Sequence, residues 1–161
     1  MIYDPVILGL IIKVSPSLLP LVKNELIFAA SKLLIGDKGC VYNKDLKITK
    51  VGETVADIAN YANEEFDLSS AIIKIVNLLA KEDSDSKYIV IVLDDYSEKN
   101  RIKTALQIDL NNNYGCCFLF CTIKYKYDEL KDFEAIHPRC KYLHFGTTDG
   151  LGNTILSVYK E

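Results

Sequence analysis

The stretch Val6–Ser17, VILGLIIKVSPS, decides how the rest of the chain is read. Its first seven residues carry no charge, and Lys13 ends the run. A helix that crosses a membrane needs about 20 apolar residues, so this run is too short for one. It is typical of a strand buried on both faces at the centre of a parallel sheet. Ligands of such sheets bind at the carboxyl ends of central strands, so the loop Lys13–Ser17 is the first candidate site.

The bulk composition predicts one folded domain over residues 1–161. Of these residues 49% are hydrophobic and 25% are charged, as in soluble globular domains. A net charge of -3 argues against a nucleic-acid partner. The five cysteines are odd in number, and three lie in the apolar segment 116–121, so a disulfide framework is not expected. A reducing compartment, cytoplasm and/or nucleus, is expected, with no signal peptide and no membrane contact.

Periodicity along the chain predicts alternating strands and helices. Strands are expected at 6–12, 39–42, 46–51, 88–93, 115–123 and 140–145. Helices are expected at 18–35, 53–63, 71–81, 98–112, 127–136 and 153–159, with Ser17, Asp67 and Ser97 near their starts as caps. This order predicts an α/β fold with a doubly wound, mainly parallel six-stranded sheet and helices on both faces. The short turn at 43–45 makes strand 46–51 an antiparallel edge strand.

The catalytic motifs that depend on close backbone approach are absent. No Gly-x-Gly-x-x-Gly follows the first strand, and neither a phosphate-binding Gly-Lys-Ser/Thr nor a Gly-x-Ser-x-Gly elbow occurs. We therefore expect no catalytic residues, no cofactor and no enzymatic activity. One alternative stays open. The glycines of segment 146–152 could present N–H groups to an anion, or they could form a turn with Asp149 or Asn153 capping the last helix.

Two metal hypotheses arise from the residues. His137, Cys140 and His144 lie close in sequence, but their spacing matches no standard zinc site. Asp94 and Asp95 end a central strand, and with the hydroxyls of Ser15 and Ser17 they offer the oxygen ligands that Mg²⁺ prefers.

The charge of Lys13 opposes a cation at the second of these sites. Lys13 lies in the same loop as the two serines, and its ammonium repels a metal ion. We favour an internal pair between Lys13 and Asp94, or a solvated loop, over a variant metal site.

These residues together resemble the von Willebrand factor A domain. That family opens with an apolar strand ending in Asp-x-Ser-x-Ser, has a Thr before a later helix, and has an Asp at the end of the next central strand. Here the first motif reads Lys13-Val14-Ser15-Pro16-Ser17, the Thr place falls at Phe66, and the later Asp matches Asp94. The resemblance implies a degenerate metal site that binds no metal, with relic positions Lys13, Ser15, Ser17, Phe66 and Asp94.

Within that family, the chain resembles the N-terminal domain of the proteasome regulatory-particle ubiquitin-receptor subunit. The resemblance lies in the early first strand and in the last strand and helix, 142–157. It implies a non-catalytic scaffold in a large intracellular complex, without ubiquitin-binding helices in this chain. The alternative is the similar domain of the general transcription and DNA-repair factor. The candidate contact residues for protein subunits of the complex are Lys13, Pro16, Phe66, Asp67, Asp95 and Tyr96.

Overall fold

A computed structural model describes residues 5–33, 36–43, 45–62, 65–84, 86–94 and 99–159, the side chains of 99, 100 and 159 excepted. The strands are β1 (Val6–Lys13), β2 (Lys38–Val41), β3 (Thr49–Lys50), β4 (Ser86–Leu93), β5 (Cys116–Ile123) and β6 (Cys140–Phe145). The helices are α1 (Leu19–Ser31), α2 (Val51–Ala59), α3 (Leu68–Ala80), α4 (Lys99–Asn112), η1 (Asp128–Lys131), α5 (Asp132–Ile136) and α6 (Leu151–Tyr159).

These strands form one six-stranded sheet in the order β3-β2-β1-β4-β5-β6. Four neighbouring pairs are parallel, and β3 runs antiparallel to β2 at the edge, as predicted. The apolar strand β1 lies inside the sheet and pairs with β4 along its whole length, from Val6 opposite Ser86 to Lys13 opposite Leu93. The doubly wound α/β prediction is therefore confirmed.

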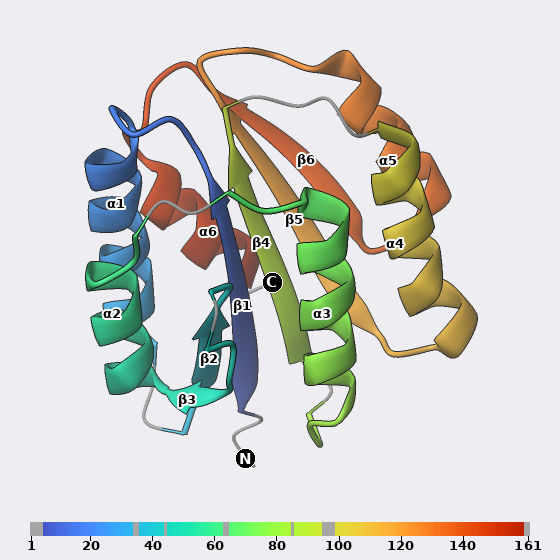
Figure 1. Cartoon of the computed structure of the whole chain (residues 1–161), viewed down its shortest axis with the longest axis horizontal. Helices are drawn as coiled ribbons and strands as arrows, with labels where there is room; N and C mark the ends of the chain where they lie inside the picture. Colours follow the sequence, from blue (N-terminus) through green and yellow to red (C-terminus); the bar gives the residue numbers. More distant parts are fainter. Residues whose placement is uncertain are drawn as a thin grey trace.

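Helices cover both faces of the sheet, with α3, α4 and α5 on one face and α1, α2 and α6 on the other (Figure 1). Successive residues of β1 alternate between the two cores, Ile7 and Ile11 toward α3 and Leu8 toward α1. Helix α3 packs closely on β1 at Gly9, because a Cβ there would lie 3.1 Å from Cγ2 of Ile75. A strand buried on both faces explains the uninterrupted apolar run.

Three local predictions were wrong. The alternating segment 46–51 forms a strand only at Thr49–Lys50, and Val51 already begins α2. Helix α1 has Leu18 at its N-cap, without a side-chain cap, because the carbonyl of Ser15 accepts the N–H groups of Leu18 and Leu19. Ser17 is therefore not the cap. Asn153 lies inside α6 and cannot cap it.

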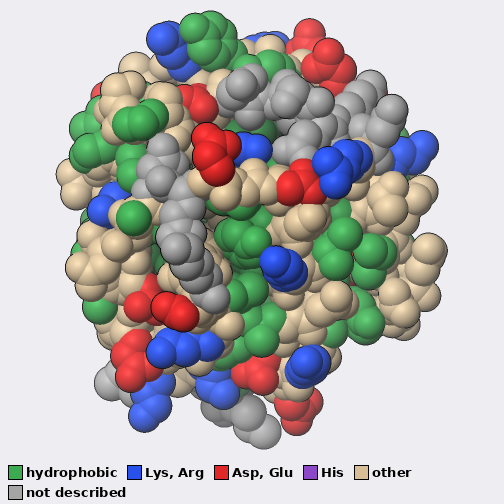
Figure 2. Space-filling view, in the orientation of Figure 1, with side chains coloured by type: hydrophobic (Ala, Val, Ile, Leu, Met, Phe, Trp, Pro, Cys, Tyr) green, Lys and Arg blue, Asp and Glu red, His purple; other side chains and the backbone are tan. Residues whose placement is uncertain are grey.

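Two further features of the fold bear on function. None of the helices within the described residues is long and apolar enough to cross a bilayer. Partly buried hydrophobic side chains, among them Tyr42, Leu46 and Ile48, pack against the core on the α3 side. Figure 2 shows hydrophobic surface between α2 and α3.

The expected helix cap Ser97 lies outside the described residues.

Candidate functional site at the carboxyl edge of the sheet

The carboxyl ends of β1 and β4 lie side by side and bring three predicted site residues together. The backbone N–H of Ser15 donates a hydrogen bond of 2.8 Å to Oδ2 of Asp94. The hydroxyl oxygens of Ser15 and Ser17 are 3.3 Å apart. One oxygen of Asp94 thus accepts a hydrogen bond from the backbone of the loop, and this bond holds the loop against the end of β4.

Lys13 and Phe66 form the second part of the site. The Nζ of Lys13 lies 5.6 Å from the centroid of the Phe66 ring, within reach of a cation–π interaction. The ring of Tyr42 packs against Phe66 with the centroids 5.0 Å apart. Phe66 thus supplies an aromatic face in the position where the resemblance places a Thr hydroxyl. The predicted pair between Lys13 and Asp94 stays a prediction.

The remaining predicted contact residues have separate surroundings. Pro16 is exposed in the loop after β1. Asp67 forms an ion pair of 2.9 Å with Arg101 and accepts the hydroxyl groups of Ser69 and Ser70. The ion pair joins the start of α3 to α4. Asp95 and Tyr96 lie outside the described residues.

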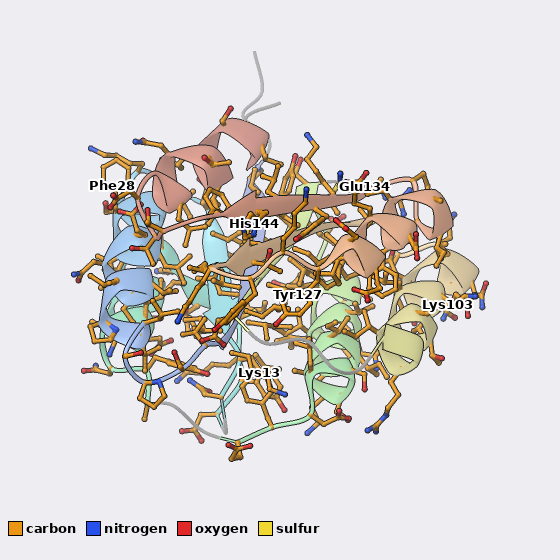
Figure 3. All side chains as sticks on the ribbon, turned by 90° about the horizontal axis from the view of Figure 1, so that it is seen from above. Lys13, Phe28, Lys103, Tyr127, Glu134 and His144 are labelled. Atoms are coloured by element: carbon orange, nitrogen blue, oxygen red, sulfur yellow. The ribbon has the colours of Figure 1, made fainter. Side chains whose placement is uncertain are left out.

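The sequence analysis missed a cluster at the ends of β5 and β6. The buried hydroxyl of Thr122 lies 2.8 Å from the Tyr142 hydroxyl and 3.1 Å from Nδ1 of His144. The N–H of Tyr127 donates to the Tyr142 hydroxyl, and the Tyr127 hydroxyl donates to the carbonyl of Asp94 at 3.1 Å. Figure 3 looks down on this edge, with Lys13, Tyr127 and His144 in a row across the sheet. The sequence feature that could have revealed this cluster is the presence of polar residues at the ends of two apolar strands.

These donors do not fit a divalent cation. Asp94 is the one carboxylate among the relic positions, and one of its oxygens accepts the Ser15 N–H. Lys13 brings a positive charge where the resemblance calls for a carboxylate, and Phe66 brings no oxygen. Among the residues that the structure describes, no group of three His, Cys, Asp or Glu is placed to hold a metal. The chemistry of the edge is that of hydrogen bonds and an ammonium group.

The histidines are likewise engaged away from any zinc site. Nε2 of His137 lies 2.8 Å from Oδ2 of Asp109, and both side chains are fully buried. The N–H of Arg139 donates to Nδ1 of His137, so that nitrogen carries no proton and Nε2 donates to Asp109. His144 contacts Thr122 instead. The two histidines therefore have different partners on different elements.

Burial makes the cysteines poor nucleophiles. It raises the pKa of the thiols of Cys40 and Cys140 to about 12, with the charge of Glu134 adding to the shift at Cys140. Burial likewise raises the pKa of Cys116, Cys117 and Cys121. Because the thiolate is the reactive form, these thiols are weakly reactive at neutral pH, and the four buried ones, all except Cys117, act as small core side chains.

A carboxylate of the chain itself lies at the end of the glycine-rich segment 146–152, where α6 begins. Gly152 N–H donates to Oε1 of Glu25 at 3.2 Å, so Glu25 of α1 interacts with the first turn of α6. A Cβ at Gly152 would lie 2.5 Å from the carbonyl oxygen of Glu25. The close approach of α1 explains this glycine, and the Glu25 charge counts against a phosphate at the same place.

Comparison with known proteins identifies the fold. No protein-family model matches the sequence, and no curated protein matches it. A von Willebrand factor type A protein from Catenulispora acidiphila is similar in structure, with a TM-score of 0.74 and 11% identity over 97% of this chain and 42% of that one. The PilB minor pilin from Streptococcus sanguinis has a TM-score of 0.71 and 10% identity over 98% of this chain and 61% of its own. BatB from Bacteroides thetaiotaomicron has a TM-score of 0.67 and 10% identity over 96% of this chain and 97% of its own.

At these identities the comparisons establish the fold alone. The chain has the α/β fold of von Willebrand factor A domains. It spans about half the length of the first two structures.

Proposed function

We propose that this chain is a non-catalytic protein-interaction domain that docks partners through the carboxyl edge of its sheet without a metal ion. The observation that carries the proposal is the occupation of this edge by internal contacts: Asp94 accepts the Ser15 N–H, and Lys13 lies over Phe66. The fold supports it, because von Willebrand factor A domains commonly mediate protein–protein contacts. The buried thiols and the absent catalytic motifs support a role without catalysis.

A narrower proposal names the assembly. The sequence resemblance favours a subunit of the proteasome regulatory particle, in the cytoplasm and/or nucleus, with the general transcription and DNA-repair factor as the alternative. In either case the chain would act as a scaffold between protein subunits.

Purification of the tagged chain from its native cells, with mass spectrometry of what co-purifies, tests both levels. Recovery of proteasome or transcription-repair subunits decides between the two assemblies. A partner-free monomer would contradict the interaction role.

A charge-reversal pair locates the docking face. Lys13→Glu is expected to release the partner, since it reverses the charge at the edge. Lys103→Glu makes the same change on the outer side of α4, away from Lys13 (Figure 3), and is expected to retain the partner. Equal retention by both variants would place the docking face elsewhere.

A further inference from the structure

The loop after β5 is held in an uncommon backbone conformation. Lys124 has φ of 76°, in the region that favours glycine. The N–H of Tyr125 donates to the carbonyl of Ile123 at 2.9 Å, which closes a three-residue γ-turn around Lys124. The N–H of Lys124 donates to the carbonyl of Phe145 at 2.8 Å and ties the turn to β6. A γ-turn with positive φ at a non-glycine residue is rare and strained.

The turn displays a cation and an aromatic ring to solvent. Tyr125 is 55% exposed, more than any other large hydrophobic side chain in the described part of the chain. The Nζ of Lys124 lies 5.3 Å from the Tyr125 ring centroid and has no carboxylate partner among the described residues. Lys126 lies 3.9 Å from Asp128, an exposed and loose ion pair. Residues strained in this way concentrate at functional sites.

This loop belongs to the same edge as Lys13. Tyr127 follows it directly and donates its hydroxyl to the carbonyl of Asp94 at the end of β4. Strand β4 separates β1 from β5, so the ends that carry Lys13 and Lys124 are two strand spacings, about 10 Å, apart. The edge thus presents two ammonium groups, each over an aromatic ring, on either side of the β4 end.

We infer that the loop Lys124–Lys126 is a contact point for an acidic protein segment, rich in Asp and Glu, at the docking face of the proposed function, on which this inference rests. The exposed ring and hydroxyl of Tyr125 provide an apolar contact and a hydrogen-bond donor, and Tyr is enriched where binding energy concentrates. The ammonium of Lys124 complements carboxylates in charge, which favours acidic over neutral partners. Lysine at this strained position keeps the charge at the turn where glycine would fit more easily.

A selection from a random dodecamer peptide library displayed on phage tests the partner chemistry with the intact chain as bait. The expected result is enrichment of Asp and Glu in the selected peptides. Their synthetic copies should bind Tyr125→Ser at least tenfold more weakly than the wild type, and Lys124→Gln about fivefold more weakly. Lys103→Gln and Leu21→Ser change an exposed lysine and an exposed leucine elsewhere, and should bind as the wild type does.

A Lys124→Gly variant separates strain from charge. It should melt at a higher temperature than the wild type and yet bind the acidic peptides as weakly as Lys124→Gln. Three results would each overturn the inference: selected peptides that are not enriched in Asp and Glu, a selection that yields no enriched peptides, or binding of the selected peptides by Tyr125→Ser that equals binding by the wild type. Retention of native partners by Tyr125→Ser, with their loss from Lys13→Glu, would overturn this inference alone and leave the proposed function standing.

Discussion

Removal of the Asp109 carboxylate is the sharpest test of how the fold is held together. Asp109 is fully buried at the end of α4 and accepts hydrogen bonds from Nε2 of His137 at 2.8 Å and from the N–H of Cys116 at 3.1 Å. Nη2 of Arg139 adds a third contact at 3.3 Å. The carboxylate therefore joins α4, β5 and the segment before β6.

The magnitude follows from the donors that Asp109→Ala leaves behind. Two buried N–H groups would lose their acceptor, at about 1–3 kcal/mol each, whereas the partly exposed Arg139 guanidinium can turn to water. We therefore expect the free energy of unfolding to fall by about 4 kcal/mol, a large part of the roughly 5–15 kcal/mol of an ordinary domain.

Urea unfolding followed by circular dichroism measures this loss. With an m value of about 2 kcal/mol/M, the midpoint should drop by about 2 M. Asp83→Ala removes an exposed carboxylate and should leave the free energy of unfolding within about 0.5 kcal/mol of the wild-type value, which keeps the midpoint within about 0.25 M.

If Asp109→Ala does not fold, Asp109→Asn serves as the second variant. The N–H of Cys116 and Nε2 of His137 bond to different oxygens of Asp109, so the single amide oxygen of Asn can replace only one acceptor and a loss of about 2 kcal/mol is expected. A loss below about 1 kcal/mol for both variants would refute the assigned role.

The pH dependence gives an independent check. Burial alone would raise the pKa of Asp109, but the hydrogen bonds from His137 and Cys116 outweigh it and hold the pKa below the usual range. A carboxylate with a lowered folded pKa stabilises the fold fully above its unfolded pKa, about 3.9, and loses that contribution as pH falls through the folded value. The stability difference between wild type and Asp109→Ala should stay constant from pH 7 to about 5 and shrink below about 4. If the stability difference between the wild type and Asp109→Ala disappears between pH 7 and 5, Asp109 is not a charged acceptor at neutral pH.

Three further predictions concern packing, the sheet edge and metal. Gly152→Ala should lower the free energy of unfolding by about 2 kcal/mol, because the new Cβ would lie 2.5 Å from the carbonyl oxygen of Glu25. Gly52→Ala, in α2 with open space around its Cβ, should instead raise it by about 0.5–1 kcal/mol in the same urea titration. Glu134→Val should increase aggregation measured by light scattering, because Oε1 of Glu134 accepts the N–H of Tyr142 on edge strand β6 at 2.8 Å; unchanged scattering would argue against this protective role. Millimolar Mg²⁺ or Mn²⁺ should leave the melting temperature unchanged, and a metal-dependent rise would restore the variant metal site.

Sequence patterns predicted the central strands well because burial on both faces leaves a clear signature. The predicted 115–123 strand differs from β5 by one residue, and the predicted 6–12 strand differs from β1 by one residue. The segment 46–51 failed for a physical reason. Leu46 and Ile48 alternate with polar residues because they pack against the core on the α3 side, yet only Thr49–Lys50 joins the hydrogen-bond ladder. Alternation reports burial of one face, and it carries no information on whether a neighbouring strand is there to pair.

The site was predictable only where strand order decides it. Ser15 and Asp94 meet because adjacent parallel strands end together, and the order of strands follows from the alternation of elements. The contacts of Asp109 with His137 and of Glu25 with Gly152 join residues 28 and 127 positions apart in the sequence. Each depends on how two helices pack, and a single polar residue within an apolar pattern does not reveal its partner.

The structure also changes the meaning of the substitution at Lys13. In the sequence, Lys13 stands where the von Willebrand factor A motif has an Asp, so a carboxylate is missing from a site that would bind a cation. In the fold, its ammonium lies over Phe66, and Lys124 over Tyr125 repeats the arrangement two strands away. Asp94, the carboxylate that remains among the relic positions, has one oxygen bound to the backbone N–H of Ser15. Two ammonium groups flank this carboxylate, and their positive charge is the electrostatic basis of the carboxylate-bearing partner that we propose for this surface.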